Sequence, residues 1–378
     1  MQHFAPIGTL AAAYNAPSGP AFNGGNISYG SLYEAVQAMA SYSASSAPTA
    51  GGTLTINGVA IANYDFCVKQ GSQTISAFTA TDWFTGTQDT RSAFVVVNGS
   101  LTINAGITVI PTVRKLFVVV YCTGNLTLNG TISMSLRGAN HSGTGSSGGA
   151  TTAGAVRIAT GTFSGVSNPT IAAAGAAGGT GVATNWTNGN AGQSAGTTLA
   201  TGGGGGGGKG AHNSTNNAWG SGAGASGTAF SGGAGGGAFA DFFQSATGPA
   251  GAGGSSGGAG GAGAGGGEGG VGNPSPARVG GSADSGTGGV LVVISAASVS
   301  GTGALVANGG SQTSSSASPA PNSGVCGGAS GGGLVCLMGR SISGPTLMAS
   351  GGTAAATGFS PISGGSGGSG FASQLIIP

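Results

Sequence analysis

Charged residues are nearly absent from this sequence. Only 4% of its 378 residues are Asp, Glu, Lys or Arg, and the net charge is +2, whereas an ordinary globular protein is about 25% charged. No basic run is present, and binding to nucleic acid needs clustered Lys and Arg that displace counterions from phosphates. We therefore expect no nucleic-acid partner.

Long apolar runs are missing as well. The longest block, VLVVISAASV at 290–299, has the length of a strand and is shorter than the about 18 residues of a membrane span. The N-terminal stretch MQHFAPIGTLAAAY lacks the basic region and the apolar core of a secretory signal. We expect no membrane insertion, and a protein that is made and kept in a cytoplasm, or that leaves it by lysis or within an assembled particle.

Residues that bind metals or form disulfides are few and scattered. Three histidines, His3, His141 and His212, are too far apart in the sequence to suggest a cluster. Buried free thiols are expected in a reducing compartment, with disulfides or metal binding as the alternative. The four cysteines, none in CxxC spacing, are Cys67, Cys122, Cys326 and Cys336. No metal and no cofactor are predicted.

Acidic residues offer little for catalysis. Cleavage of a polysaccharide needs two carboxylates about 5–10 Å apart, and the only near pair in the sequence is Asp82 and Asp89, with Trp83 between them. A surface loop around a turn is the simpler interpretation of that stretch. A sugar-cleaving site there remains the alternative.

Two motifs that resemble catalytic signatures lack the surroundings that the chemistry needs. Lys209 follows a glycine run, but the next residue is Gly210 and not the Ser or Thr that a phosphate-binding loop uses to hold Mg²⁺. The G-x-S-x-G matches at Ser330 and Ser366 are expected by chance at this glycine content, and neither lies between a strand and a helix. We predict a protein that is not an enzyme and has no catalytic residues.

Glycine, in contrast, is in great excess, at 86 residues. Between 248 and 272 it occupies every third position without a miss. Period three fits the left-handed extended helix with three residues per turn, and glycine lets neighbouring backbones approach closely. We therefore predict a lattice of polyglycine-II-type helices. A disordered Gly/Ser/Ala tether is the alternative.

Repeated strand units lie on both sides of this glycine zone. FVVVNGSLTINAGITV (94–109) aligns with FVVVYCTGNLTLNGTISM (117–134), and the unit at 288–310 aligns with the one at 331–352. A weaker third copy of the second unit spans 153–175. Each unit reads as strand, corner and strand, which is the pattern that stacked coils of a β-solenoid require.

One helix is predicted near the N-terminus, in SYGSLYEAVQAMASYS. Ser31 has the position of an N-cap, and Glu34 follows at capping-box spacing. Leu32, Val36 and Met39 share one face, so the helix needs a partner surface. We predict that this face docks onto another protein of the same assembly.

The predicted fold is thus all-β or irregular, in three parts. Residues 1–50 form an N-terminal docking segment with the short helix. Residues 51–140 form a β-rich stem of β-solenoid-like strand repeats. Residues 141–378 form a glycine-rich tip of polyglycine-II and β-repeat structure.

Three loops interrupt the glycine zone, at 184–193, 209–219 and 238–244. They combine aromatic rings with amides, a pairing that suits a sugar ring, which stacks on one face and forms hydrogen bonds at its rim. The alternative is that the aromatic residues cap the lattice or pack beside strands. The candidate receptor-binding residues are Asn185, Trp186, Asn188, His212, Asn213, Asn216, Asn217, Trp219, Phe239, Phe242 and Phe243.

The run NGSLTINAGITVIPTVRKLFVVVYCTGNLTLNGTISMSLRGANHSG, with the glycine tracts and the 288–310 unit after it, resembles bacteriophage tail-fibre and receptor-binding proteins with glycine-rich C-terminal parts. The glycine zone alone is similar to phage adhesins whose tip is a polyglycine-II sandwich with variable loops. The resemblance implies a non-enzymatic virion protein, assembled in the host cytoplasm, whose loops contact a host surface glycan or outer-membrane protein. The N-terminal segment would contact other tail or fibre proteins.

Two other functions stay open from the sequence. One is a purely structural virion or filament subunit, and the other is a polysaccharide-degrading tailspike. A homo-oligomer such as a trimer would be in keeping with a fibre, although no heptad stretch indicates one.

Overall fold

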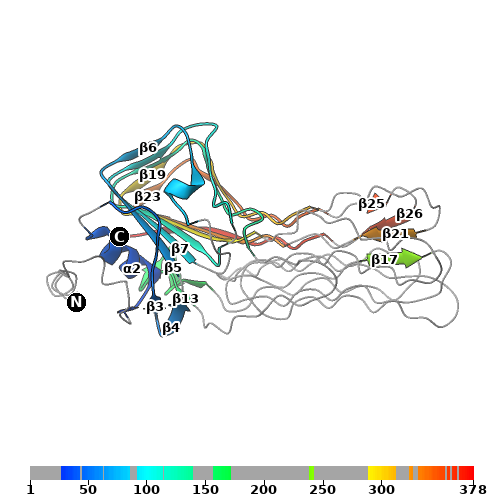
Figure 1. Cartoon of the computed structure of the whole chain (residues 1–378), viewed down its shortest axis with the longest axis horizontal. Helices are drawn as coiled ribbons and strands as arrows, with labels where there is room; N and C mark the ends of the chain where they lie inside the picture. Colours follow the sequence, from blue (N-terminus) through cyan, green and yellow to red (C-terminus); the bar gives the residue numbers. More distant parts are fainter. Residues whose placement is uncertain are drawn as a thin grey trace.

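The protein is mostly β-strand with one α-helix, so the predicted all-β class is confirmed (Figure 1). The computed structural model describes residues 27–42, 45–62, 64–85, 92–113, 115–138, 156–171, 238–241, 288–311, 323–326, 331–353, 356–357, 360–363 and 366–378.

The centre of the fold is a stack of three parallel sheets, in which each complete turn of the chain supplies one strand to each sheet. We call such a turn a rung. The rungs are, in order along the stack, β5 (Tyr64–Gln70) with β6 (Gln73–Ile75); β7 (Ser92–Asn98) with β8 (Leu101–Ile103) and β9 (Thr108–Val109); β10 (Val118–Cys122) with β11 (Leu126–Leu128) and β12 (Thr131–Ser133); β18 (Val290–Ser295) with β19 (Ser298–Ser300) and β20 (Ala304–Val306); β22 (Leu334–Gly339) with β23 (Ser341–Ile342) and β24 (Thr346–Met348); and β27 (Phe371–Ile376) alone.

The sheet pairing crosses the predicted boundary at residue 140. β10 pairs in parallel with β7 on one side and with β18 on the other, so that Val118 lies between Ala93 and Leu291. The stem strands and the strand units of the predicted tip therefore form one continuous sheet. The predicted division into separate stem and tip does not hold for these strands.

From β7 to β22 this first sheet, which runs from β5 to β27, is buried on both faces, as expected for parallel strands that are continuously apolar. Side chains inside the rungs form an inner core, and those on the opposite face form an outer core. One row of the inner core, paired strand by strand, is Val95, Val120, Val293 and Leu337. The corresponding row of the outer core is Phe94, Val119, Val292 and Cys336.

The helix α2 (Leu32–Ala40) covers the outer core, on the side of this sheet away from β6, β19 and β23 (Figure 1). The predicted N-cap is confirmed, because Ser31 Oγ accepts a hydrogen bond from Glu34 N at 3.2 Å. Leu32, Val36 and Met39 are fully buried in the outer core. Their prediction as a docking face for another protein is wrong, because the second apolar face of the sheet already needs this cover.

Short strands complete the cover of the outer core. The weak copy predicted at 153–175 is not a rung, since its strands pair antiparallel and pack on the outer core. The covering strands are β1 (Ile27–Tyr29), β3 (Thr53–Ile56), β4 (Val59–Ala62), β13 (Val156–Arg157), β14 (Thr162–Phe163), β15 (Val166–Ser167) and β16 (Thr170–Ile171). The remaining described elements are β2 (Thr49–Ala50), the 3-10 turn η1 (Ala80–Asp82), β17 (Ala238–Asp241), β21 (Ser323–Cys326), β25 (Ala356–Thr357) and β26 (Ser360–Ser363).

Glycine is required where the corner between the second and third strands of one rung crosses the rung below it. Gly301 has φ +109°, and a Cβ there would lie 2.1 Å from the carbonyl oxygen of Leu128. Gly344 repeats this one rung further, with φ +98° and 2.1 Å to Gly301 O. At this corner, the backbone of each of these rungs therefore lies directly against the backbone of the rung below it.

We predict that Gly301→Ala lowers the free energy of unfolding by about 2–4 kcal/mol, because it combines an unfavourable φ with a backbone clash. Gly106→Ala is the matched control, since Gly106 has φ +80° and no atom near its would-be Cβ; it is expected to cost about 1–2 kcal/mol. Chemical denaturation of both variants measures the difference. Equal losses of stability in the two variants would show that the close backbone approach at Gly301 adds nothing to the cost of the substitution.

Candidate functional site

The chain makes its long excursions at one corner of the stack. Within a rung, the connections are short, as at 123–125 and 129–130. Between the third strand of one rung and the first strand of the next, they extend over 134–289, 307–333 and 349–370. The roots of these excursions run side by side away from the stack (Figure 1), whereas residues 156–171 of the first excursion pack on the outer core.

The outgoing legs of two excursions, 307–311 and 349–353, are bonded to each other in register. Ala307 N donates to Met348 O at 2.8 Å, and Gly309 N donates to Ser350 O at 2.9 Å. Asn308 Oδ1 also accepts from Ser350 N at 2.8 Å. The order of the rungs is thus continued beyond the last strand of each rung.

The returning legs, 288–289, 331–333 and 366–370, bond in two directions. Gly333 N donates to Ala307 O at 2.7 Å, on an outgoing leg, while Gly333 O accepts from Phe371 N at 2.9 Å, on the next returning leg. A strand in a pleated sheet forms its backbone hydrogen bonds within the plane of that sheet. These glycines instead form hydrogen bonds to neighbouring legs in two different directions.

Close approach explains why these positions are glycine. A Cβ on Gly333 would lie 2.0 Å from Gly289 O, and a Cβ on Gly370 would lie 1.9 Å from Gly333 O. Real side chains do not fit between such backbones. The returning legs therefore pack as bare backbone, which is the kind of packing predicted for the glycine run at 248–272; that run itself lies outside the described residues.

The three excursions also meet one another away from their roots. β17, in the first excursion, pairs antiparallel with β21, in the second, so that Phe239 lies opposite Val325. β21 in turn contacts β25 and β26 of the third excursion. The predicted loop 238–244 thus begins at a point where all three excursions come together.

The other predicted receptor-binding residues lie outside the described part of the chain. For Phe239 the structure gives the strand pairing only. Outside the described residues are Asn185, Trp186, Asn188, His212, Asn213, Asn216, Asn217, Trp219, Phe242 and Phe243.

Of the predicted acid pair, Asp82 is exposed at the end of η1, and Asp89 lies outside the described residues. Trp83 is half-buried against the inner core, with Lys69 Nζ 5.4 Å from its ring centre. Within the described ranges, no group of three or more His, Cys, Asp or Glu side chains could hold a metal ion.

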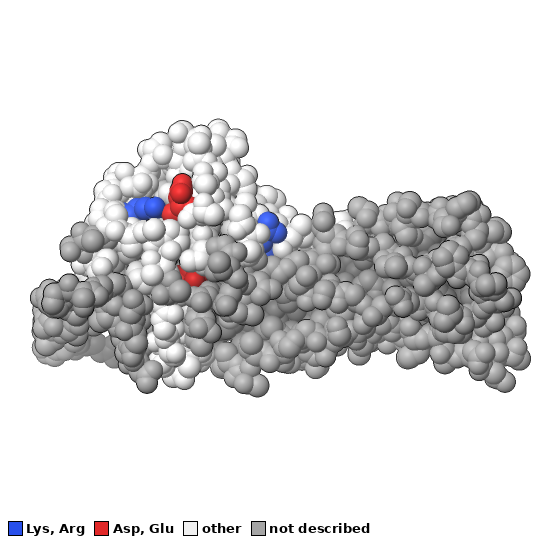
Figure 2. All heavy atoms as spheres, viewed as in Figure 1, with Lys and Arg blue, Asp and Glu red and all other residues white. Residues whose placement is uncertain are grey.

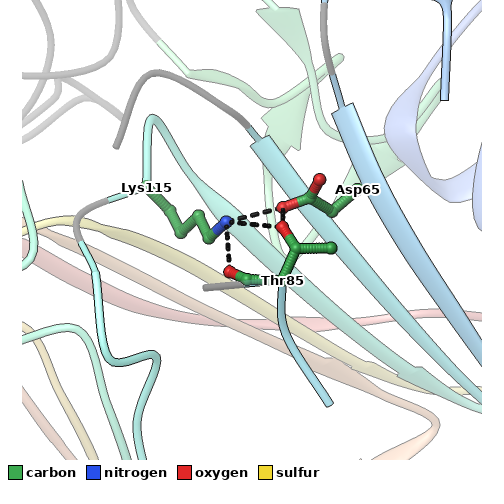
Figure 3. A network of polar contacts seen from close by, with 3 residues as sticks. All are labelled: Asp65, Thr85 and Lys115. Carbon is green, nitrogen blue, oxygen red and sulfur yellow. Dashed lines mark hydrogen bonds and ion pairs between the residues drawn. The ribbon is translucent and has the colours of Figure 1, made fainter. Parts of the chain in front are cut away.

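A buried polar network, which no pattern in the sequence predicts, links three segments (Figure 3). Lys115 Nζ lies 2.6 Å from Asp65 Oδ2, with exposed fractions of 1% and 2%. Lys115 also donates to Thr85 O at 3.1 Å, and the Thr85 hydroxyl donates to Asp65 Oδ2. Asp65 lies on β5, Thr85 in the connection between β6 and β7, and Lys115 just before β10. The network therefore holds these three segments together. Its charged partners are 50 residues apart and belong to no motif.

We predict that Lys115→Met destabilises the fold by about 3–5 kcal/mol, because it leaves the Asp65 carboxylate buried without its cation. The double variant Lys115→Met, Asp65→Leu should recover most of this loss. Lys69→Met removes a half-buried lysine over Trp83 and should cost about 1 kcal/mol or less. Urea unfolding curves of the three variants measure these changes. A loss of stability in Lys115→Met no larger than that in Lys69→Met would contradict the prediction.

Three cysteines are buried free thiols, as predicted: Cys67, Cys122 and Cys336. Burial raises the pKa of Cys67 and of Cys122 to about 11, and that of Cys336 to about 12. The thiolate is the reactive form, so these thiols are inert at neutral pH. Because these three thiols are free, the alternative of disulfides does not hold for them.

The raised thiol pKa values predict a loss of stability at high pH. The folded state holds these protons more tightly than the unfolded chain, so the stabilisation is complete below the ordinary thiol pKa of about 9 and is lost as pH rises toward about 11 to 12. The free energy of unfolding should therefore fall over this range. Replacing all three cysteines by Ala should make the fall shallower, and an unchanged slope would count against the thiols as its cause.

Comparison with models of protein families, with curated proteins and with solved structures finds no match to this chain. Among the described residues, no helix is long and apolar enough to cross a lipid bilayer.

Proposed function

We propose that this protein is a non-enzymatic fibre or adhesin protein of a bacteriophage virion, which attaches to a host surface receptor through loops on a glycine-rich scaffold. The receptor would be a glycan or an outer-membrane protein. The observation that carries the proposal is that all long excursions leave the stack at one corner, on glycine legs bonded to one another. This arrangement sends the roots of three long segments side by side away from a packed base (Figure 1).

The finer fold belongs to the same proposal. The rungs are interpreted as the coils of a β-solenoid, and the glycine legs as the root of a polyglycine-II lattice that includes the run at 248–272. Two-directional backbone bonding at Gly333 supports this interpretation, as does the lack of room for a Cβ at Gly370. Such a lattice replaces side-chain packing by hydrogen bonds between backbones.

A receptor-binding role fits the chemistry of the surface. Few charged side chains appear on the described part of the visible face (Figure 2), and only 4% of the whole chain is charged. Recognition would then rest on aromatic stacking and amide hydrogen bonds, which the loops at 184–193, 209–219 and 238–244 supply. Loop residues on a packed scaffold can vary without loss of the fold.

The three tryptophans of the chain allow a matched test. Trp186→Ala and Trp219→Ala are each expected to reduce binding of the full chain to receptor-bearing cells about 10-fold or more, since tryptophan is prominent among residues that dominate binding energy. Trp83→Ala, in the half-buried site of the stack, is expected to leave binding of the folded protein unchanged. The measurement is fluorescent labelling of a panel of bacteria, with thermal unfolding of each variant as the folding control.

Absence of binding to any bacterium in the panel would favour a purely structural role in a virion or filament. A loss that is the same for all three variants would show that the tryptophan loops do not form the receptor site.

A further inference from the structure

The first end of the stack is closed by the protein's own chain. β2 pairs antiparallel with the outer edge of β5. Next to it, Gly51 N donates to Tyr64 O at 2.7 Å and Ser46 N donates to Val68 O at 2.8 Å. Val68 N in turn donates to Ser46 Oγ at 3.0 Å. Residues 45–51 therefore satisfy the backbone groups that an edge strand would otherwise present to another chain.

The inner core is covered at this end too. Ile75, the last inward residue of β6, is buried, and Phe84 packs over the same core with Phe78 against it. The segment between β6 and β7 thus closes the first end of the stack.

Within the described part of the chain, the other end of the stack has no such cover. Ile342 in β23 is paired with Val299, and Leu347 in β24 is paired with Leu305. Val299 and Leu305 are fully buried, whereas Ile342 and Leu347 are partly exposed. The inner core therefore reaches solvent at its last complete rung.

β27 adds half a rung beyond that point. Gln374 is level with Leu337 of the inner core, and its neighbour Leu375 is buried in the outer core, so the Gln374 side chain lies on the inner face and is exposed. Among the described residues, the second and third sheets have no strand at this level. The only exposed large apolar side chains of the described residues, Met348 at 37% and Ile376 at 45%, also lie on β24 and β27.

We propose that this open end binds the open end of a second copy of the chain, about a two-fold axis perpendicular to the stack. A half rung is self-complementary, because the β27 of each copy fills a level that the other copy leaves empty. Head-to-tail stacking is excluded by residues 45–51, which occupy the opposite edge, and a two-fold contact uses the same surface on both copies.

The charge pattern is compatible with a contact between identical surfaces. β23, β24 and β27 contain no charged residue, so these strands bring no like charges together; the exposed Arg340 lies at the corner between β22 and β23. On the described free edge of β27, Ile376 N donates to Ser164 Oγ at 3.0 Å. The proposed contact therefore does not use the backbone edge at Ile376 and is made by the inner side chains of β27 and of the last rung.

Sedimentation equilibrium of the full chain tests the proposal. A reversible monomer–dimer equilibrium is expected. Gln374→Lys places a cation in the apolar joint and should raise the dimer dissociation constant about 10- to 100-fold. Thr74→Lys adds the same charge at an exposed position of β6, at the closed end, and should leave the dissociation constant unchanged.

A second variant distinguishes loss of the dimer contact from misfolding of the chain. Ile376→Ser removes an exposed apolar side chain, so it should weaken the dimer while the thermal unfolding of the monomer stays close to that of the parent chain. The proposal is overturned if the chain remains monomeric at every concentration, if it forms a trimer or an open-ended polymer, or if Gln374→Lys and Thr74→Lys dissociate alike.

Discussion

Parallel pairing in register is the constraint on which the rest of this structure depends. Strands in a sheet lie about 4.8 Å apart, and β7, β10, β18 and β22 follow one another as hydrogen-bonded neighbours in one sheet. Each corner and each leg must then repeat at the same spacing as the strands. Where a leg also has a neighbour in a second direction, no room is left for a side chain, and glycine follows as a requirement of geometry.

The two cores follow from the same pairing. Because identical positions of successive rungs lie level with each other, apolar residues at alternate positions form rows on both faces of the sheet that runs from β5 to β27. One face is closed by the other two sheets of the stack. The other face needs a separate cover, and α2 with the short strands around it supplies one, which is why the most amphipathic segment of the chain is buried rather than free.

The local parts of this structure could be predicted from the sequence, and the long-range parts could not. Strand units at 94–109, 117–134, 288–310 and 331–352 were recognisable by alternation and by their likeness to one another, and the cap at Ser31 by its spacing. The pairing of Val118 with Leu291 leaves no local trace, so the division at residue 140 was wrong.

The site shows the same limit. Its glycine content and its aromatic loops are visible in the sequence, but the convergence of three excursions on β21 is a matter of topology. Lys115 and Asp65 likewise meet only because the rungs bring residues 50 positions apart to one level. The likeness of 153–175 to a rung was misleading because its two short strand pairs fold back on themselves locally.

The three long excursions leave the stack at one corner, and this has a consequence for how such a protein can evolve. By closure entropy alone, each doubling of a flexible loop costs only about 0.6 kcal/mol. An excursion of the length of 134–289 is thus about 1.5 kcal/mol more costly to close than one of the length of 307–333. Insertions, deletions and exchanges in the excursions that spare residues 156–171, which cover the outer core, leave the hydrogen bonds of the rungs intact, so the stack can stay unchanged while the segments that it carries are replaced.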